Sequence, residues 1–382
     1  MRVLLTILLG GASLLLVGAL YLLQQLHFSS GDTFRMAAKL RSDSISHSQD
    51  PAARYQKLRL EALKRAELYE FFIQQDHLYM GMIVNRDQSG APLSECDSLL
   101  FSSLRFVALE KMGMHNEAEH TWESIITAVD NGKWHRHPKC RARWTSRDMI
   151  VGVLAALSQH PSQGEGYLRD LIAYVEQTGG YIGSGPFYVS RLTPGLAQMI
   201  RILSEEYGLS KDELPNNIRF GFSTVEFNTV TPSRGYTAHL SAMNIWLEIE
   251  LRERRKKSSS IVKVRTVTEL IDQLLYPVSS YSMEDQRLQW VSNRLVALDP
   301  DNLFFKWLQL KSANALTVKS KGDLLEELLS MEQFPQERLP QNCDRKADYL
   351  WQRDSLEYDM QFKTCTEEFS GVDFLWMVSL LI

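Results

Sequence analysis

The chain has 382 residues, of which 44% are hydrophobic and 23% are charged. This composition is typical of a globular protein and excludes a disordered or fibrous chain. The formal net charge is -4, so the chain as a whole does not attract polyanions, and we expect no nucleic-acid partner.

An uncharged segment lies at the start of the chain, from Val3 to Leu23, and reads VLLTILLGGASLLLVGALYLL. About 21 residues at 1.5 Å each can cross a bilayer core of roughly 30 Å. We predict a transmembrane helix within residues 1–26 that acts as an uncleaved signal anchor. A cleavable signal peptide is the alternative, but its apolar stretch is usually shorter and ends in a small-x-small site, whereas QQLHF follows here.

The orientation of this anchor rests on two opposing signals. Basic residues flank both ends of the segment, and their number after it would favour a cytoplasmic body. Four cysteines are present in the body: Cys96, Cys140, Cys343 and Cys365. Their even number is typical of disulfides formed in an oxidising compartment, although four unrelated buried thiols are the alternative. We predict a single-pass inner-membrane protein with a periplasmic body.

Residues 27–49 form a polar, Ser-rich linker, and residues 50–382 form a helical domain. Asp50 and Pro51 have the residue types of an N-cap and a first helical position. From there on, nearly every segment with a readable period is helical, which predicts an all-α fold. Only two stretches look extended: GPFYVSRL near Phe187, and the residues from Ile218 onward.

Two kinds of helix are expected in this domain. The segments Met149 to Leu157 and Phe374 to Ile382 are apolar on every face, which predicts burial all round. Others, such as Glu165 to Gly180, have one apolar stripe. Inner helices covered by outer amphipathic ones make a two-layer fold, either an α/α toroid or an α-solenoid. Because no 34-residue repeat is found, we favour the toroid.

Three aspartates share one setting, since each follows Ser or Thr by three positions and precedes an apolar helix. They are Asp97, Asp148 and Asp373. The pattern resembles a capping box, in which the acidic side chain reaches back to the N-cap amide. A second interpretation is functional: if these helices belong to an inner ring, their N-termini gather at one rim and bring the carboxylates together with aromatic and basic loop residues.

The segments ECDSLLF, RHPKCRARWTSRDM, SRGYTAHL and DYLWQRD carry this loop chemistry. Together with the helical pattern they resemble the α/α-toroid carbohydrate-active enzymes, the glycosidases and polysaccharide lyases. The resemblance is one of architecture, covers roughly 50–382, and implies a sugar-binding cleft at one end of a helical barrel. Glycoside hydrolysis needs two carboxyl groups, and our candidates are Asp97 and Asp148. A Cys96–Cys140 disulfide would hold their surroundings together.

Substrate contacts are expected from aromatic, basic and polar side chains of the same segments. They are Trp134, His137, Arg143, Trp144, Arg147, Tyr236, His239, Arg353 and Asp373. In a lyase, His137, His239 or Tyr236 would be the base, while Arg143 or Arg147 would neutralise a uronate carboxylate. The alternative for the aromatic and His residues is packing in the core.

No motif for a nucleotide, a redox cofactor or a metal is present, so we expect neither cofactor nor metal. The sequence therefore predicts a membrane-anchored envelope protein that binds, and cleaves or modifies, a polysaccharide. The alternative is a non-catalytic helical scaffold that docks a protein partner in the envelope, in which case the aspartates serve only as helix caps.

Overall fold

A computed structural model describes residues 50–86, 89–92, 98–140, 145–184, 189–221, 236–259, 280–330 and 370–382. The chain divides into two compact units, Met1–Asp50 and Pro51–Ile382. The predicted anchor and linker, residues 1–49, lie outside the described residues and stay predictions. Within the described ranges, no helix has both the length and the apolar character needed to span a membrane.

The all-α class is confirmed for the second unit. Its helices are α2 (Pro51–Asp76), α3 (Ser98–Met112), α4 (His115–Ile126), α5 (Arg147–Gln159), α6 (Pro161–Gln177), α7 (Pro194–Glu206), α8 (Asn216–Arg219), α10 (Tyr236–Ser259), α12 (Ser280–Leu298), α13 (Leu303–Ser312), α14 (Val318–Ser330) and α15 (Val372–Leu381), with a 3-10 turn at Lys211–Glu213. The first helix begins at Pro51, as predicted from the Asp-Pro pair.

The strands form three short antiparallel hairpins. They are β1 (Leu78–Tyr79) with β2 (Met82–Ile83), β3 (Val129–Asp130) with β4 (Lys133–Trp134), and β5 (Tyr181–Ser184) with β6 (Val189–Arg191). The extended stretch predicted near Phe187 is confirmed where it contains β6. The prediction that Ile218 opens an extended stretch was wrong, because Asn216–Arg219 is helical.

The helices predicted to be inner ones are buried. All ten residues of α15 are buried, and α5 is buried from Asp148 to Ser158. Most of α3 between Ser98 and Leu109 is buried as well. Burial on every face is possible only when other helices surround a helix, so these three elements belong to the inner layer. The inner layer also includes α7, α10 and α13, most of whose apolar residues are buried.

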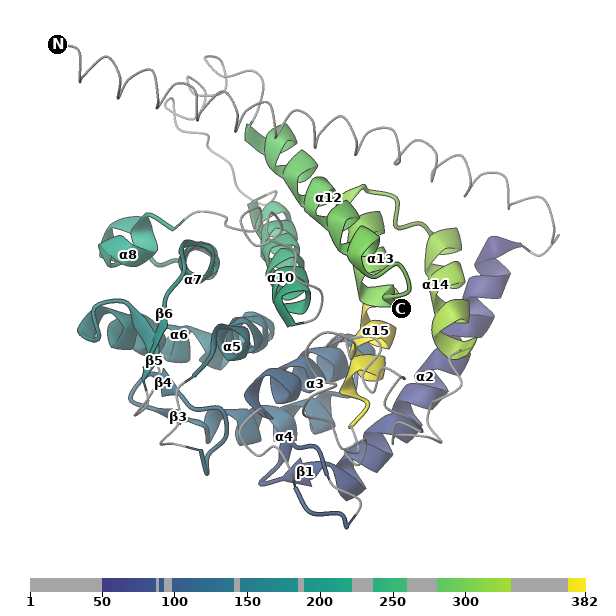
Figure 1. Ribbon diagram of the computed structural model, residues 1–382, viewed down its shortest axis with the longest axis horizontal. Helices are drawn as coiled ribbons and strands as arrows, with labels where there is room; N and C mark the ends of the chain where they lie inside the picture. The colour runs from purple at the N-terminus through teal and green to yellow at the C-terminus, as the bar shows by residue number, and fades with distance from the viewer. Residues whose placement is uncertain are drawn as a thin grey trace, which may run out of the picture. The chain divides into compact units, whose positions relative to one another are not determined.

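The helices pack as an inner and an outer set (Figure 1). Among the inner helices, α3 packs against α5 and α15, and α10 packs against α5, α7 and α13. On the outside, α4 covers α3, α6 covers α5, and α12 covers α13. The late helix α14 packs against α2, the first described helix. A helix near the end of the chain thus contacts the helix at the start of the unit.

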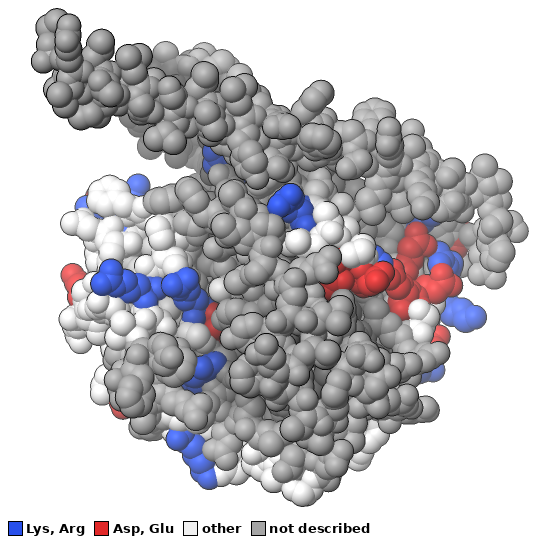
Figure 2. All heavy atoms as spheres, viewed as in Figure 1, with Lys and Arg blue, Asp and Glu red and all other residues white. Residues whose placement is uncertain are grey.

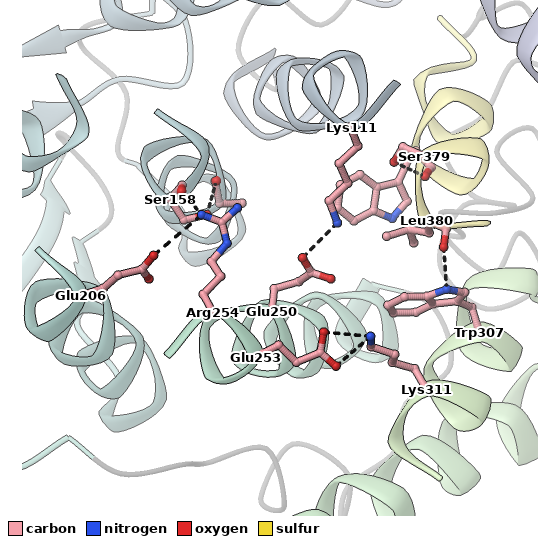
Figure 3. Close-up of polar contacts among 12 residues, drawn as sticks. Lys111, Ser158, Glu206, Glu250, Glu253, Arg254, Trp307, Lys311, Ser379 and Leu380 are labelled. Carbon is pink, nitrogen blue, oxygen red and sulfur yellow. Dashed lines mark hydrogen bonds and ion pairs between the residues drawn. The ribbon is translucent and has the colours of Figure 1, made fainter. Parts of the chain in front are cut away.

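The inner helices start together and end together. Each hairpin follows the end of an outer helix and precedes an inner one, so the hairpins and the inner N-termini share one rim. At the opposite rim the helix ends meet α10 (Figure 3). There Lys111 of α3 pairs with Glu250 at 3.0 Å, and Lys311 of α13 pairs with Glu253 at 2.8 Å.

Candidate functional site

The start of α5 carries the first candidate carboxylate. Ser146 is the N-cap residue in extended conformation, and its side chain makes no capping bond. Thr145, the residue predicted to cap this helix, donates its hydroxyl to the carbonyl of Trp134. The predicted capping box is therefore wrong at this position, because the Thr145 hydroxyl is already committed to the preceding hairpin.

Asp148 consequently lacks the role that the capping pattern gives it. Its side chain is buried, and its Oδ1 atom has no hydrogen-bond partner. The hydroxyl of Ser146 beside it is likewise buried and without a partner. Buried polar atoms are nearly always hydrogen-bonded in proteins, so two such oxygens without a partner within one turn distinguish the start of α5.

Asp373 differs from Asp148. It is buried near the start of α15, and its Oδ1 accepts a hydrogen bond from the amide of Phe374 at 3.0 Å. Gly371, with φ of 72°, is the N-cap residue, so the capping box predicted from Ser370 does not form here either. Ser370 instead accepts a bond from the Val372 amide at 3.4 Å. Asp373 thus has a local structural bond that Asp148 lacks.

The starts of α3 and α5 lie side by side. The amide of Leu99 donates to the carbonyl of Arg136 at 3.0 Å, and the amide of Leu100 lies 3.2 Å from the sulfur of Met149. Asp97 precedes Ser98, the first residue of α3, and itself lies outside the described residues. The two helices chosen for the catalytic pair are therefore neighbours at their N-termini.

Three predicted substrate contacts lie in the core. Trp134 is fully buried against Tyr167, with ring centroids 5.9 Å apart. His239 is buried with its ring 5.3 Å from that of Phe305. His137 is buried too, and we describe it next. A ligand reaches these rings only if the side chains around them move.

His137 holds two hairpins together. Its ring stacks on Tyr79 at 5.5 Å and 11°. The Lys139 amide donates to Nδ1 at 3.1 Å, so the ring proton lies on Nε2, which is 3.2 Å from the Tyr79 carbonyl. In addition, the ammonium group of Lys139 lies over the Tyr79 ring, 4.3 Å from its centroid. His137 and Lys139 thus have a structural role, since both hold the β1–β2 hairpin in place.

The structure describes only some of the remaining predicted site residues. Arg147 is exposed as the first residue of α5. Tyr236 is the first residue of α10, and only its backbone is described. Arg143, Trp144 and Arg353 lie outside the described ranges. Their contribution to a site stays a prediction.

Cys140 is buried and disulfide-bonded. The other three cysteines, Cys96, Cys343 and Cys365, lie outside the described residues. The Cys96–Cys140 pairing therefore stays a prediction.

The sequence analysis missed a polar row on α10. Asn244, Glu248 and Arg252 are spaced by four residues and so lie on one helix face. Glu248 is buried, pairs with Arg252, and accepts a bond from Gln198 of α7 at 3.4 Å. The signal was available, because Asn244 and Glu248 are four residues apart within the mostly apolar stretch SAMNIWLEIEL, and Arg252 follows directly at the same spacing.

Shifted pKa values appear among the described residues near the opposite rim. Burial raises the pKa of Glu206 at the end of α7, and the nearby Arg254 partly offsets this rise. Burial also lowers the pKa of Lys321, and the positive charges of Lys311, Arg59 and Lys111 add to the effect. Figure 3 shows Glu206 and Arg254 near the ion pairs that Lys111 and Lys311 make with α10.

No protein-family model matches this chain, and no curated protein matches its sequence. The described part of the chain also contains no group of three His, Cys, Asp or Glu side chains that could bind a metal. The function must therefore be argued from the residues and their geometry.

Proposed function

We propose that Pro51–Ile382 is an α/α toroid that binds and hydrolyses an envelope polysaccharide at the rim where its inner helices begin. The packing supports this architecture, since neighbouring contacts pass from α3 through α5, α7, α10 and α13, and α15 packs on α3. The hydrogen bond that Trp307 of α13 donates to the Leu380 carbonyl, at 3.1 Å, links α13 to α15. Ion pairs join the helix ends at one rim, and we place the ligand at the other, where the hairpins lie.

The observation that carries the proposal is the carboxyl group of Asp148. It is buried at the start of an inner helix, has an unpartnered oxygen, and lies beside the start of α3, which follows Asp97 directly. Glycosidases use two carboxyl groups on either side of the glycosidic bond. We assign Asp148 as the general acid and Asp97 as the second carboxylate, with the exposed Arg147 binding anionic sugar groups.

We further propose that the protein is anchored in the inner membrane by residues 3–23, with its helical unit in the periplasm. The uncharged segment has the length of a bilayer span. The disulfide-bonded state of Cys140 supports an oxidising compartment. An envelope polysaccharide would be within reach of a protein in this location.

The test is the substitution Asp148→Asn in the full chain, purified in detergent and incubated with a panel of envelope polysaccharides. Reducing ends released per minute are measured. Loss of a general acid lowers the hydrolysis rate by about 100-fold or more, while binding of the polymer is retained. The control is Asp130→Asn, an exposed aspartate on β3, which should leave the rate unchanged.

The alternative is a non-catalytic scaffold that docks an envelope protein. The core positions of Trp134, His137 and His239 favour it, since those side chains offer no surface to a sugar. If the native chain neither binds nor hydrolyses any polymer of the panel, the polysaccharide proposal fails and the scaffold takes its place.

A further inference from the structure

Helix α2 has an outward face with large apolar side chains. Leu60, Leu68 and Phe71 are 57%, 42% and 55% exposed. At 100° per residue, spacings of eight and eleven positions from Leu60 place all three side chains within a quarter turn of the helix. They lie on one exposed face of the helix, and we call these three side chains the α2 stripe.

The α2 stripe is separate from the face that α2 contributes to the core. The buried residues of the helix are Tyr55, Ala62, Ala66, Tyr69, Glu70 and Ile73. They face α14 and α15, against which the helix packs. The core is thus complete without the stripe, and three large apolar side chains on one exposed helix face mark an interaction surface.

Basic residues accompany the stripe. The helix carries five basic residues, all before Ala66: Arg54, Lys57, Arg59, Lys64 and Arg65. Its acidic residues are Glu61, Glu67, Glu70 and Asp76, of which the exposed Glu67 lies on the face of the stripe. Arg54 is occupied by ion pairs to Asp323, at 2.6 Å, and Glu326. Figure 2 shows acidic side chains gathered over α14, which supplies these partners.

Lys57 and Lys64 lie on the exposed side of α2 with the stripe. Among the described residues, neither is paired with an acidic side chain. Lys64 falls between Leu60 and Leu68 on the same helix face, four residues from each. Two available ammonium groups beside an apolar stripe match the chemistry of an anionic phospholipid surface, with phosphates above and acyl chains below.

The chain outside the described residues indicates the same partner. The uncharged segment ends at Leu23, with 27 residues between it and Pro51, and 27 residues in a random-coil conformation span roughly 30 Å. A bilayer-inserted segment therefore keeps α2 close to the lipid surface at a high effective concentration. Even a weak affinity of the stripe for lipid is then sufficient.

We propose that the α2 stripe binds the surface of the membrane in which the chain is anchored. Leu60, Leu68 and Phe71 enter the boundary between headgroups and acyl chains, and Lys57 and Lys64 pair with anionic lipid phosphates. This inference rests on the proposed anchor and is independent of the proposed hydrolysis.

The experiment uses the full chain in vesicles that contain a phospholipid with a photoactivatable diazirine in its acyl chain. One set is phosphatidylcholine with phosphatidylglycerol, and the other is phosphatidylcholine alone. After illumination, lipid cross-links are mapped by mass spectrometry. We expect cross-links on Leu60, Leu68 and Phe71 in the anionic vesicles, and about tenfold fewer after Lys57→Glu with Lys64→Glu.

A triple variant, Leu60→Gln with Leu68→Gln and Phe71→Gln, should lose the α2 cross-links. Its melting curve should match that of the native chain, because exposed side chains contribute little to folding. Phe220→Gln is the matched control, since Phe220 is 69% exposed on another element. This control should leave the α2 cross-links unchanged.

Cross-links within residues 3–23 serve as the internal reference. If they form but none forms on α2 in either kind of vesicle, the membrane-surface inference is overturned while the anchor stands. If neither region reacts with lipid, both the anchor and this inference fail. Unchanged α2 cross-linking in the triple variant, or joining of α2 to a second copy of the chain in place of lipid, also overturns the inference.

Discussion

At the scale of single residues, the most buried charges are structural. Arg105 of α3 donates through Nε to Glu70 of α2 at 3.0 Å, and its Nη2 pairs with the other carboxylate oxygen. Both side chains are more than nine-tenths buried, and Gln74 donates a further bond to Glu70 at 2.9 Å. This two-point ion pair fixes an inner helix to an outer one.

Removing one partner of this pair should be costly. Glu70→Gln leaves the Arg105 guanidinium buried without a counter-charge, and we expect a loss of about 3–5 kcal/mol of unfolding free energy. Urea unfolding of the full chain in detergent, followed by circular dichroism, measures it. Glu165→Gln, which removes the exposed Arg169–Glu165 pair, should cost about 0.5 kcal/mol or less. Equal losses in the two variants would contradict this account.

The type of a single residue does not determine whether its side chain is buried. The apolar segment Met149 to Leu157 predicts a buried helix with polar and aromatic residues before it, and the burial is confirmed for α5. Of the residues before it, Trp134 and His137 are in the core, whereas Arg147 is exposed. A tryptophan or a histidine suits either environment, so only its neighbours, Tyr167 and Tyr79 here, decide its place.

At the scale of elements, a structural repeat connects the first half of the unit. Backbone bonds close the three hairpins at His77, Ala128 and Gly180, at intervals of about 50 residues. Each interval contains a hairpin, an inner helix and an outer helix in that order, with α3 and α4 in the first and α5 and α6 in the second. The search for a 34-residue period missed it, since the repeat is carried by turn geometry more than by side-chain identity.

The turns of the first two hairpins have the same backbone conformation. Met80 and Gly81 have φ of 51° and 76°, and Asn131 and Gly132 have 49° and 78°. Two successive positive φ angles are characteristic of the type I′ turn of two-residue hairpins. The Asn-Gly pair is a strong sequence signal for this turn, whereas Met-Gly is not, because only its second residue favours a positive φ.

The turn at Gly132 offers a test of this geometry. Gly132→Ala adds a methyl group that meets the carbonyl of Asp170 and the side chain of Tyr174. Gly113 has a similar φ, 80°, but open space around it. We expect Gly113→Ala to cost about 1–2 kcal/mol from backbone strain, and Gly132→Ala about 1–3 kcal/mol more from the clash. Urea unfolding of both variants measures the difference in unfolding free energy. Equal losses would show that α6 moves away from the added methyl group without cost.

At the scale of the whole helical unit, the late helices close it. The buried helix α15 packs on α2 and α3, and Trp376 meets Trp246 of α10 edge to face at 4.4 Å. The hydroxyl of Tyr55 donates to the Leu381 carbonyl at 2.8 Å. Residues more than 300 positions apart therefore share one core, which favours a single cooperative unit.

Trp376→Ala tests this closure. The cavity should cost about 3–5 kcal/mol, and unfolding should remain a single transition in which circular dichroism and tryptophan fluorescence coincide. Phe220→Ala, on an exposed side chain, should change the unfolding free energy by about 0.5 kcal/mol or less. Two separate transitions in the Trp376 variant would show that the early and late helices fold independently.

The sequence by itself determined the helical class, the start of α2 and the burial of α5 and α15, because these depend on local patterns of apolar and capping residues. Tertiary structure decided which starts adjoin: α3 meets α5 through contacts between residues 49 positions apart, Leu100 and Met149. It also decided that Thr145 bonds to Trp134 and leaves Asp148 unpartnered. Such choices depend on long-range packing, and no local pattern in the chain encodes them.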